Sequence, residues 1–550
     1  MSSFFHRVRR VPQWLAGLPS LALFAILFAA VVLSHLTLLR LPYYWDEGGY
    51  YIPAALDFYH RFTLIPEFTN AHPPLPNVVL GTLWHVTGYH ILATRLMVAA
   101  FAAVALLALF RLTQRLIGAS AAVVVTALTA IYPIWFAQST LAHADIFAAA
   151  FTLAGFACYF SLLAVDTPNG TGVSTPQPSS RTMIAVAALF SLAALSKETA
   201  IVEPAALALI QFVLLLLHWR KPQQRQEHLR WLAALCFPVL PLALWFAYHH
   251  HATGFTFGNP EYLRYNATAN FTWAHIFLSL KYRAMHLFWQ RNMYVPWLLT
   301  LAAFLLPRRK NIAPLALRIY TTFAVLLVVN WGFFSVLGGA LLTRYLLPVY
   351  ALMIFAQAAA WRERTSYWPA FAALTAAAFI PALWINGPHA MAPEDNLTYR
   401  DMIVVQQQAI DFLNAHDPDA HVITAWPVAA ALVRPELGYS QHIFHVTSMD
   451  NFTRPEVMKA AARPGDYDTM LAFTTKYEPP EVLNQLAHTT DTTRLAAYDT
   501  VRDLTPEELA RVLHGTIVWQ THIGGEWSAV LRFPRRYNVD LTMPALPQRQ

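Results

Sequence analysis

Residues 14–51 read WLAGLPSLALFAILFAAVVLSHLTLLRLPYYWDEGGYY, a long apolar run that ends in two adjacent carboxylates among aromatic residues. A helix that crosses a lipid bilayer needs about 20 mostly apolar residues, and residues 14–39 meet this requirement. No cleavage site of the A-x-A type follows the run, so we interpret it as a retained membrane span rather than a removed signal peptide. We expect the N-terminal side of this span to lie in the cytoplasm.

Apolar runs of this kind recur through the first 386 residues. The chain of 550 residues is 56% hydrophobic and 13% charged, with a mean hydropathy of +0.39, which is more apolar than a soluble core requires. Further runs lie at residues 91–110, 231–248, 321–337 and 370–384. The sequence therefore predicts an α-helical, polytopic membrane protein.

The net charge of +7 does not indicate a nucleic-acid partner. The basic residues occur in short clusters between apolar runs rather than along one face, which is the pattern of membrane topology signals. Cys158 and Cys236 both lie in apolar runs, so the sequence predicts no disulfide framework.

These basic clusters indicate which ends of the spans face the cytoplasm. If the cluster at residues 7–10 is inside, the later clusters also fall inside, provided that residues 183–217 form a hairpin of two short helices that turns at residues 196–198. This topology predicts about eleven spans in the cytoplasmic (inner) membrane. It also predicts outer loops at residues 41–90 and 249–290, and an active site on the extracytoplasmic side, where most acidic residues of the membrane region fall.

From about residue 387 the composition changes to that of a soluble domain. Of the 31 acidic residues, 20 lie in residues 387–550. Helix-like and strand-like patterns occur at residues 402–413, 421–426, 467–473, 516–522 and 527–533. We therefore predict a transmembrane domain over residues 1–386 and a small extracytoplasmic α/β domain over residues 387–550. The latter contains no nucleotide-binding glycine motif, so we expect no nucleotide cofactor.

Asp46 and Glu47, directly after the first span, are the leading candidates for catalysis. Ionised groups at a membrane surface are costly unless they are paired or functional. They could act as a general base or as ligands of a divalent cation, with the neighbouring aromatic residues stacking on a sugar. The alternative is an interfacial aromatic belt with an Asp at a helix start. On the evidence of this segment alone, the two interpretations have equal weight.

His72 and Asp145 are further candidates on the predicted outer side. His72, before two prolines, could bind phosphate or move a proton, or it could merely belong to a proline-rich helix entry. Asp145 is the only acid in a long apolar region, at the predicted outer start of a span. A lone acid there indicates a functional site, with a favourable charge at a helix N-terminus as the alternative.

Basic side chains on the same predicted side could bind a phosphate. Lys197 lies at the tip of the predicted hairpin beside Glu198, which could pair with it, and a structural ion pair is the alternative. Arg344, followed by Tyr345, begins a span and could reach a lipid phosphate, or it could extend to the interface as long basic side chains do. Arg264 lies in the second predicted outer loop.

Taken together, these segments resemble the GT-C class of membrane glycosyltransferases, in particular the superfamily of dolichyl-phosphate-mannose protein mannosyltransferase and lipid A aminoarabinose transferase. The resemblance covers about residues 14–386 and rests on the order and spacing of its motifs. These are Asp46-Glu47 after the first span, His72-Pro73-Pro74-Leu75, Arg95-Leu96, Asp145, Ser196-Lys197-Glu198, and Arg344-Tyr345 with Pro348.

The resemblance implies transfer of a sugar from a polyprenyl-phosphate donor to a lipid, glycan or protein acceptor, usually with inversion, among membrane lipids on the outer side. It implies that Asp46 is the leading catalytic carboxylate, that Asp145 supports it, and that basic residues bind the donor phosphate. Aminoarabinose transferases carry Lys before the two prolines, where this chain has His72. We therefore do not assign the transferred sugar by analogy with the aminoarabinose transferases.

A membrane transporter or lipid flippase is the competing interpretation, because such proteins also place charges in a membrane cavity. They often contain two related halves with interrupted helices at matching positions. This sequence has no such symmetry, and its large first outer loop and soluble C-terminal region favour an enzyme.

Overall fold

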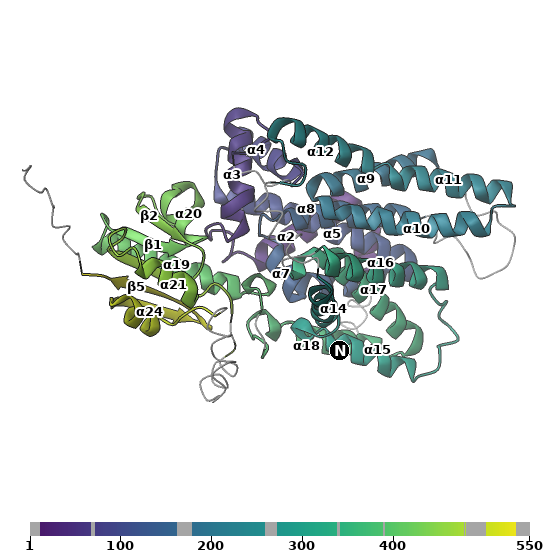
Figure 1. Cartoon of the computed structure of the whole chain (residues 1–550). Coiled ribbons are helices and arrows are strands. Elements are labelled where there is room, and N and C mark those ends of the chain that lie inside the picture. The colour runs from purple at the N-terminus through teal and green to yellow at the C-terminus, as the bar shows by residue number, and fades with distance from the viewer. Residues whose placement is uncertain are drawn as a thin grey trace, which may run out of the picture. The chain divides into compact units, whose positions relative to one another are not determined.

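The computed structural model describes residues 11–67, 72–161, 179–258, 272–337, 341–388, 391–477, 479 and 502–534. The chain divides into two compact units. The first comprises Met1–Gly387 together with Ala392–Tyr399, and the second comprises Pro388–Met391 together with Arg400–Gln550. Figure 1 shows that the first unit is built of helices and that the second contains a sheet.

The first unit consists of α-helices and several short 3-10 or π-helical turns. The α-helices are α2 (Ser20–Ser34), α3 (Ile52–Arg61), α4 (Leu75–Thr87), α5 (Ile91–Ile117), α6 (Ala119–Ile131), α7 (Pro133–Gln138), α8 (Ala144–Phe160), α9 (Ser180–Ser196), α10 (Val202–Leu217), α11 (Pro222–Cys236), α12 (Val239–Thr253), α14 (Trp273–Phe288), α15 (Tyr294–Phe304), α16 (Leu317–Val336), α17 (Leu347–Arg364) and α18 (Trp368–Phe379). The short turns are η1 (Glu47–Tyr51), η3 (Glu198–Ile201), η5 (Gln290–Asn292), η6 (Thr343–Leu346), η7 (Pro381–Leu383) and η8 (Pro393–Asp395).

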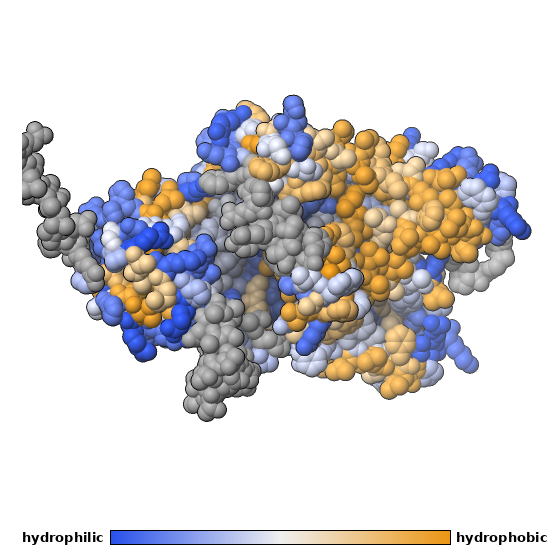
Figure 2. All heavy atoms as spheres, in the orientation of Figure 1, coloured by the Kyte–Doolittle hydropathy of each residue, from blue (hydrophilic) through white to orange (hydrophobic). Residues whose placement is uncertain are grey.

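Several of these helices could cross a bilayer. Within the described ranges, four are long and apolar enough, namely Ile91–Ile117, Glu198–Leu217, Pro222–Thr253 and Leu317–Val336. Six shorter apolar helices accompany them, at Ser20–Ser34, Ala119–Ile131, Ala144–Phe160, Ser180–Ser196, Tyr294–Phe304 and Trp368–Leu383. Figure 2 shows apolar side chains gathered over much of the helical unit. Because lipid would cover such a surface, the prediction of a multi-pass α-helical membrane protein is confirmed.

Two helix breaks have clear local causes. The run predicted as one span over residues 14–39 is divided at Pro19, after which α2 begins, because proline lacks the N–H that a continuous helix needs. The apolar run at residues 183–217 is divided at Lys197, whose extended backbone separates α9 from η3 and α10. The interruption predicted at residues 196–198 is therefore present.

Helix α8 is a buried element of the first unit, and it packs against α5, α9 and α17. At Gly155 it approaches α9 so closely that a Cβ atom there would lie 3.0 Å from the Phe190 ring. This packing determines where the first turn of α8, with Asp145, can lie.

The second unit contains a five-stranded mixed sheet in the order β2-β1-β3-β5-β4. Strand β1 (His421–Ala425) is parallel to β2 (His445–Met449) and β3 (Thr469–Phe473). Strand β5 (Glu526–Arg532) is antiparallel to β3 and to β4 (Thr516–Ile523). The accompanying helices are α19 (Thr398–His416), α20 (Val428–Val433), α21 (Arg454–Ala461) and α24 (Pro506–Leu513).

The strand-like patterns in the sequence correspond to β1, β3, β4 and β5, whereas β2 has no apolar pattern. Strand β2 contains His445, Thr447 and Ser448 and lies at the edge of the sheet, where it pairs only with β1. An edge strand can be held by its backbone pairing with little buried apolar surface, so sequence patterns miss it.

Replacing Gly155 by Ala should destabilise the protein by about 1–3 kcal/mol, because the added methyl group meets the Phe190 ring between two packed helices. Gly332 of α16 is the matched control, since a Cβ atom there has nothing within 4 Å. Gly332→Ala should therefore be neutral or stabilising by up to about 1 kcal/mol. Thermal unfolding in detergent measures both variants, and equal melting temperatures would contradict the close packing of α8 on α9.

Candidate active site

Arg344 lies at the centre of a buried acidic cluster. It belongs to η6, the turn that leads into α17, and it is 3% exposed. Its Nη2 donates to Asp46, its Nη1 donates to Glu394 at 2.5 Å, and its Nε lies 3.2 Å from Asp145 Oδ2. Three carboxylates from distant parts of the chain therefore share one guanidinium.

The local sequence explains the position of this arginine. Pro348 occupies the first turn of α17, where a missing N–H has no helical partner to lose. The 3-10 turn before it places Arg344 at the helix entrance. An arginine suits this position because its planar fork of N–H donors can serve several carboxylates at once.

Lys197 approaches the same cluster from the break between α9 and η3. Its Nζ donates to Asp145 Oδ1 at 2.6 Å and lies 3.9 Å from the centre of the Tyr345 ring. Burial lowers the pKa of Lys197, and the Asp145 carboxylate opposes this shift. Asp145 thus lies between two cations, Lys197 at one oxygen and Arg344 at the other.

Asp46 and Glu47 are adjacent in sequence but have different surroundings. Glu47 is completely buried, and its carboxylate accepts hydrogen bonds from both terminal nitrogens of Arg95 and from the backbone N–H groups of Tyr44 and Ala142. The Asp46 side chain is 19% exposed and contacts Arg344. Of the two carboxylates, that of Asp46 is the more accessible.

His72 and Glu198 form a second pair beside the cluster. Nδ1 of His72 lies 2.8 Å from Glu198 Oε2, and the histidine ring stacks on Tyr51 with ring centres 5.8 Å apart. Glu198 directly follows Lys197 in sequence. The structure therefore brings an imidazole, an ammonium and a guanidinium to one region.

Two acidic residues of this region were not singled out from the sequence. Glu394 bonds to Arg344, while Asp395 accepts hydrogen bonds from the Thr343 hydroxyl and the Gln290 amide. Burial raises the pKa of Glu394 to about 8, although Arg344 opposes this shift. Both follow the last apolar run, where no spacing distinguishes them from the many acids of the C-terminal region.

A small cavity of about 30 Å³ lies beside Asp145 and Lys197. It is also lined by Glu203, which accepts a hydrogen bond from the Asn330 amide at 3.2 Å, and by Thr152. Such a volume is large enough for about one or two water molecules, and polar side chains line part of it. Acidic groups therefore continue from the cluster toward the interior of the helices.

The structure thus brings together Asp46, Asp145, Lys197, Arg344 and Tyr345, with His72 and Glu198 beside them. Glu47 is held in a separate ion pair with Arg95. Arg264 lies outside the described residues. These roles were inferred from sequence and remain predictions.

The described part of the chain contains no group of three or more His, Cys, Asp or Glu side chains placed to hold a metal ion. The two carboxylates that could ligate one, Asp46 and Asp145, both contact Arg344. Because a guanidinium already holds these carboxylates, we derive no chemical step through a divalent cation.

Comparison with known proteins gives one family match and several structural ones. Residues 71–245 match the family described as dolichyl-phosphate-mannose-protein mannosyltransferase. No curated protein sequence matches the chain.

Among solved structures, apo ArnT from Cupriavidus metallidurans is 14% identical with a TM-score of 0.50, over 93% of this chain and 98% of that one. The structure of the same protein bound to undecaprenyl phosphate is 15% identical in sequence, with a TM-score of 0.49, over 92% of this chain and 97% of that one. The apo oligosaccharyltransferase of Archaeoglobus fulgidus is 11% identical in sequence, with a TM-score of 0.42, over 82% of this chain and 69% of that one.

The matched region contains Asp145 and Lys197, and the likeness to apo ArnT shows a shared fold. The family match over residues 71–245 and the shared fold bear out the resemblance to GT-C membrane glycosyltransferases that was stated from the sequence.

Proposed function

We propose that this protein transfers a sugar from a polyprenyl-phosphate donor to an acceptor on the extracytoplasmic face of the inner membrane, with inversion. The family match supports a lipid-phosphate donor in general terms. The single observation that carries the proposal is the Arg344 cluster, in which a partly exposed carboxylate lies beside two buried cations. Sugar transfer from a phosphate needs both kinds of group.

The cations bind the leaving group. A sugar attached to phosphate is already activated, so catalysis requires that the departing phosphate be stabilised. Arg344 and Lys197 supply this charge from a buried site, where electrostatic interactions are stronger than in water. His72, paired with Glu198, adds a third donor when its imidazole is protonated.

Asp46 is the base. It takes the proton of the acceptor group, whose oxygen or nitrogen then bonds to the anomeric carbon while the bond from that carbon to the phosphate oxygen breaks. The proton remains on the carboxyl group, and the electron pair leaves with the polyprenyl phosphate. Attack opposite to the phosphate gives inversion.

Asp145 and Glu47 have positioning roles. Asp145 holds Lys197 and Arg344 on its two oxygens, which sets the distance between the two phosphate-binding cations. Glu47 anchors the segment after the first span through Arg95, and so fixes the backbone next to Asp46. Neither residue then needs to exchange a proton with the substrate.

Glu394 controls access to Arg344. Three carboxylates around one guanidinium repel each other, and the enclosed Glu394, with its raised pKa of about 8, is the one that keeps its proton near neutral pH. A protonated Glu394 is a weak partner, so a donor phosphate replaces it on Nη1 of Arg344.

The competing function is a transporter or flippase without glycosyl transfer. The acceptor, which is a lipid, a glycan or a protein, and the sugar are not specified by the geometry. Release of a radiolabelled sugar from a polyprenyl-phosphate donor separates the enzyme from the transporter.

Asp46→Asn should lower the transfer rate by roughly 10²–10⁴-fold, because the amide cannot accept the acceptor's proton. Asp57→Asn is the matched control, since the contacts of Asp57 among the described residues are with Arg61 and with the backbone N–H of Glu67. Turnover of a radiolabelled donor is measured in membranes with equal amounts of each protein. Wild-type turnover by Asp46→Asn would refute the assignment of the base.

Raising the pH through about 8 should weaken donor binding, because Glu394 then ionises and competes with the phosphate for Arg344. Glu394→Gln should remove this alkaline rise in donor KM, while the exposed control Glu67→Gln should retain it. The pH dependence of KM and kcat measures both. If the donor KM of Glu394→Gln still rose above about pH 8, a group other than Glu394 would be responsible for the pH dependence.

Arg95→Gln should destabilise the fold by about 3–5 kcal/mol, because it leaves the buried Glu47 carboxylate without its countercharge. Glu47→Gln should cost less, since Arg95 still donates to the backbone carbonyls of Thr140, Pro42 and Leu41. Melting temperatures of the two purified variants show which substitution destabilises the protein more. The reverse order would contradict the anchoring role.

A further inference from the structure

We propose that a cavity among α15, α16 and α17, which is lined along α17 from Val349 to Ala360, binds one anionic phospholipid. The cavity has a volume of about 200 Å³. Helix α17 starts next to Arg344 and ends at Arg364, which lies about 25 Å further along the axis. The residues that line the cavity do not include Asp46, Asp145, Lys197 or Arg344, so the proposal does not depend on the proposed function.

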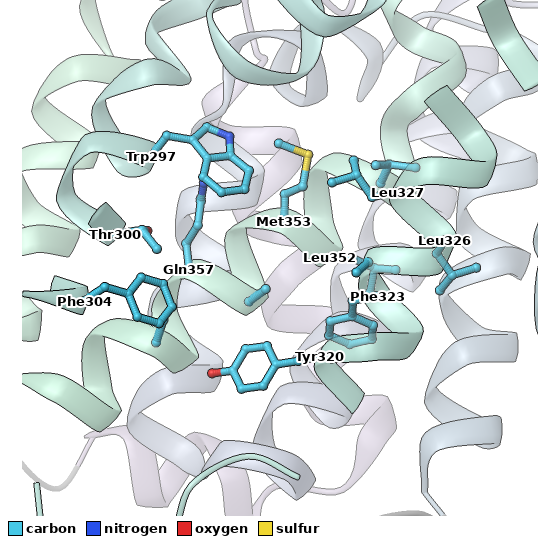
Figure 3. A pocket seen from close by; sticks show the side chains of 14 residues that line it. Trp297, Thr300, Phe304, Tyr320, Phe323, Leu326, Leu327, Leu352, Met353 and Gln357 are labelled. Carbon is cyan, nitrogen blue, oxygen red and sulfur yellow. The ribbon is translucent and has the colours of Figure 1, made fainter. Parts of the chain in front are cut away.

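The walls of the cavity fit a hydrocarbon chain. They are formed mainly by Phe304 of α15, Phe323 and Leu327 of α16, and Leu352 and Met353 of α17 (Figure 3). Packed protein interiors leave few voids larger than one water molecule. An apolar cavity of about 150 Å³ stays dry and accepts hydrocarbon ligands, so this larger one suits an alkyl segment.

One polar group in the wall has no hydrogen-bond partner. Gln357 is 2% exposed, and neither its Nε2 nor its Oε1 has a partner among the described residues. Figure 3 shows its side chain extending from α17 toward the part of the cavity where Trp297 lies. A buried amide of this kind calls for a polar ligand group, and the ester carbonyl of a phospholipid can accept a hydrogen bond from its N–H.

The other polar groups of the wall already have partners. The Thr300 hydroxyl donates to the Pro296 carbonyl and accepts from the Trp361 indole N–H. The Tyr320 hydroxyl donates to Glu363 at 3.0 Å. The position of a ligand's polar group is therefore determined by Gln357.

Two basic side chains lie near the end of the cavity that Phe304 lines. The Arg364 guanidinium lies 4.9 Å from the centre of the Phe304 ring, and the Arg308 side chain is 60% exposed beside Glu363. Basic groups between helix ends at a membrane surface attract anionic lipid headgroups. This charge selects a phospholipid of the adjoining leaflet, whereas the donor phosphate is proposed to bind at Arg344.

The depth of Gln357 agrees with this occupant. It lies seven residues before Arg364, which corresponds to about 10 Å along the helix axis. A phosphate held by Arg308 and Arg364 would place the ester groups of the lipid below it, near Gln357, with one chain in the apolar cavity.

Native mass spectrometry of the delipidated full-length protein tests the proposal. Phosphatidylglycerol and phosphatidylcholine with the same acyl chains are titrated separately. We expect one phosphatidylglycerol to bind at least five-fold more tightly than phosphatidylcholine. Ala356→Leu, which fills the cavity, should weaken this binding at least five-fold, while the same change at the exposed Ala373 of α18 should have no effect.

Two further variants separate binding from misfolding. Gln357→Leu should melt at the same or a higher temperature than wild type without lipid, since it removes an unpartnered amide, yet it should lose most of the rise in melting temperature that phosphatidylglycerol gives. Arg308→Gln with Arg364→Gln should abolish the preference for the anionic lipid, and Arg230→Gln at the exposed surface of α11 should keep it.

Several results would overturn the proposal. Equal binding of the two lipids to the wild type would exclude an anionic site, and unchanged binding by both Ala356→Leu and Gln357→Leu would exclude this cavity. One-for-one displacement of phosphatidylglycerol by undecaprenyl phosphate would identify the cavity as a site for the donor chain instead.

Discussion

The guanidinium of Arg344 binds carboxyl groups from three segments of the chain, and the positions of several helix ends depend on this interaction. Asp46 follows the first apolar run, Asp145 begins α8, and Glu394 follows α18. Without a shared cation these buried carboxylates would repel one another and lose their hydration with no compensation. Bringing the three segments together is therefore both a condition of the fold and the origin of the candidate site.

The same physics explains why two neighbouring carboxylates differ. Glu47 is surrounded by Arg95 and two backbone N–H groups, which satisfy its lone pairs and leave it no access to a ligand. Asp46, one residue earlier, shares its cation with two other acids and retains partial exposure. A fully satisfied carboxylate stabilises a loop, whereas an incompletely satisfied and accessible one is available for chemistry.

Helix α17 connects two polar features within an apolar unit. At its start, Arg344 gathers acids that need a cation. Further along, Gln357 lines an apolar cavity, and its amide has no hydrogen-bond partner among the described residues. Burial explains both, because a polar group removed from water must find a partner in the protein or in a ligand.

The sequence by itself determined the helical membrane class, the interruption at Lys197, most strands of the second unit, and a set of candidate residues that includes Asp46, Asp145, Lys197 and Arg344. These features have local signals, since apolar run length, strand alternation and charges in apolar surroundings can be recognised without knowing any contact. Only the tertiary structure decided that Glu47 pairs with Arg95, that Glu394 joins Arg344, and that helix packing leaves a cavity at Gln357. The physical reason is that these partners come from separate helices and loops, so their meeting depends on how the helices pack, which no local pattern in the sequence records.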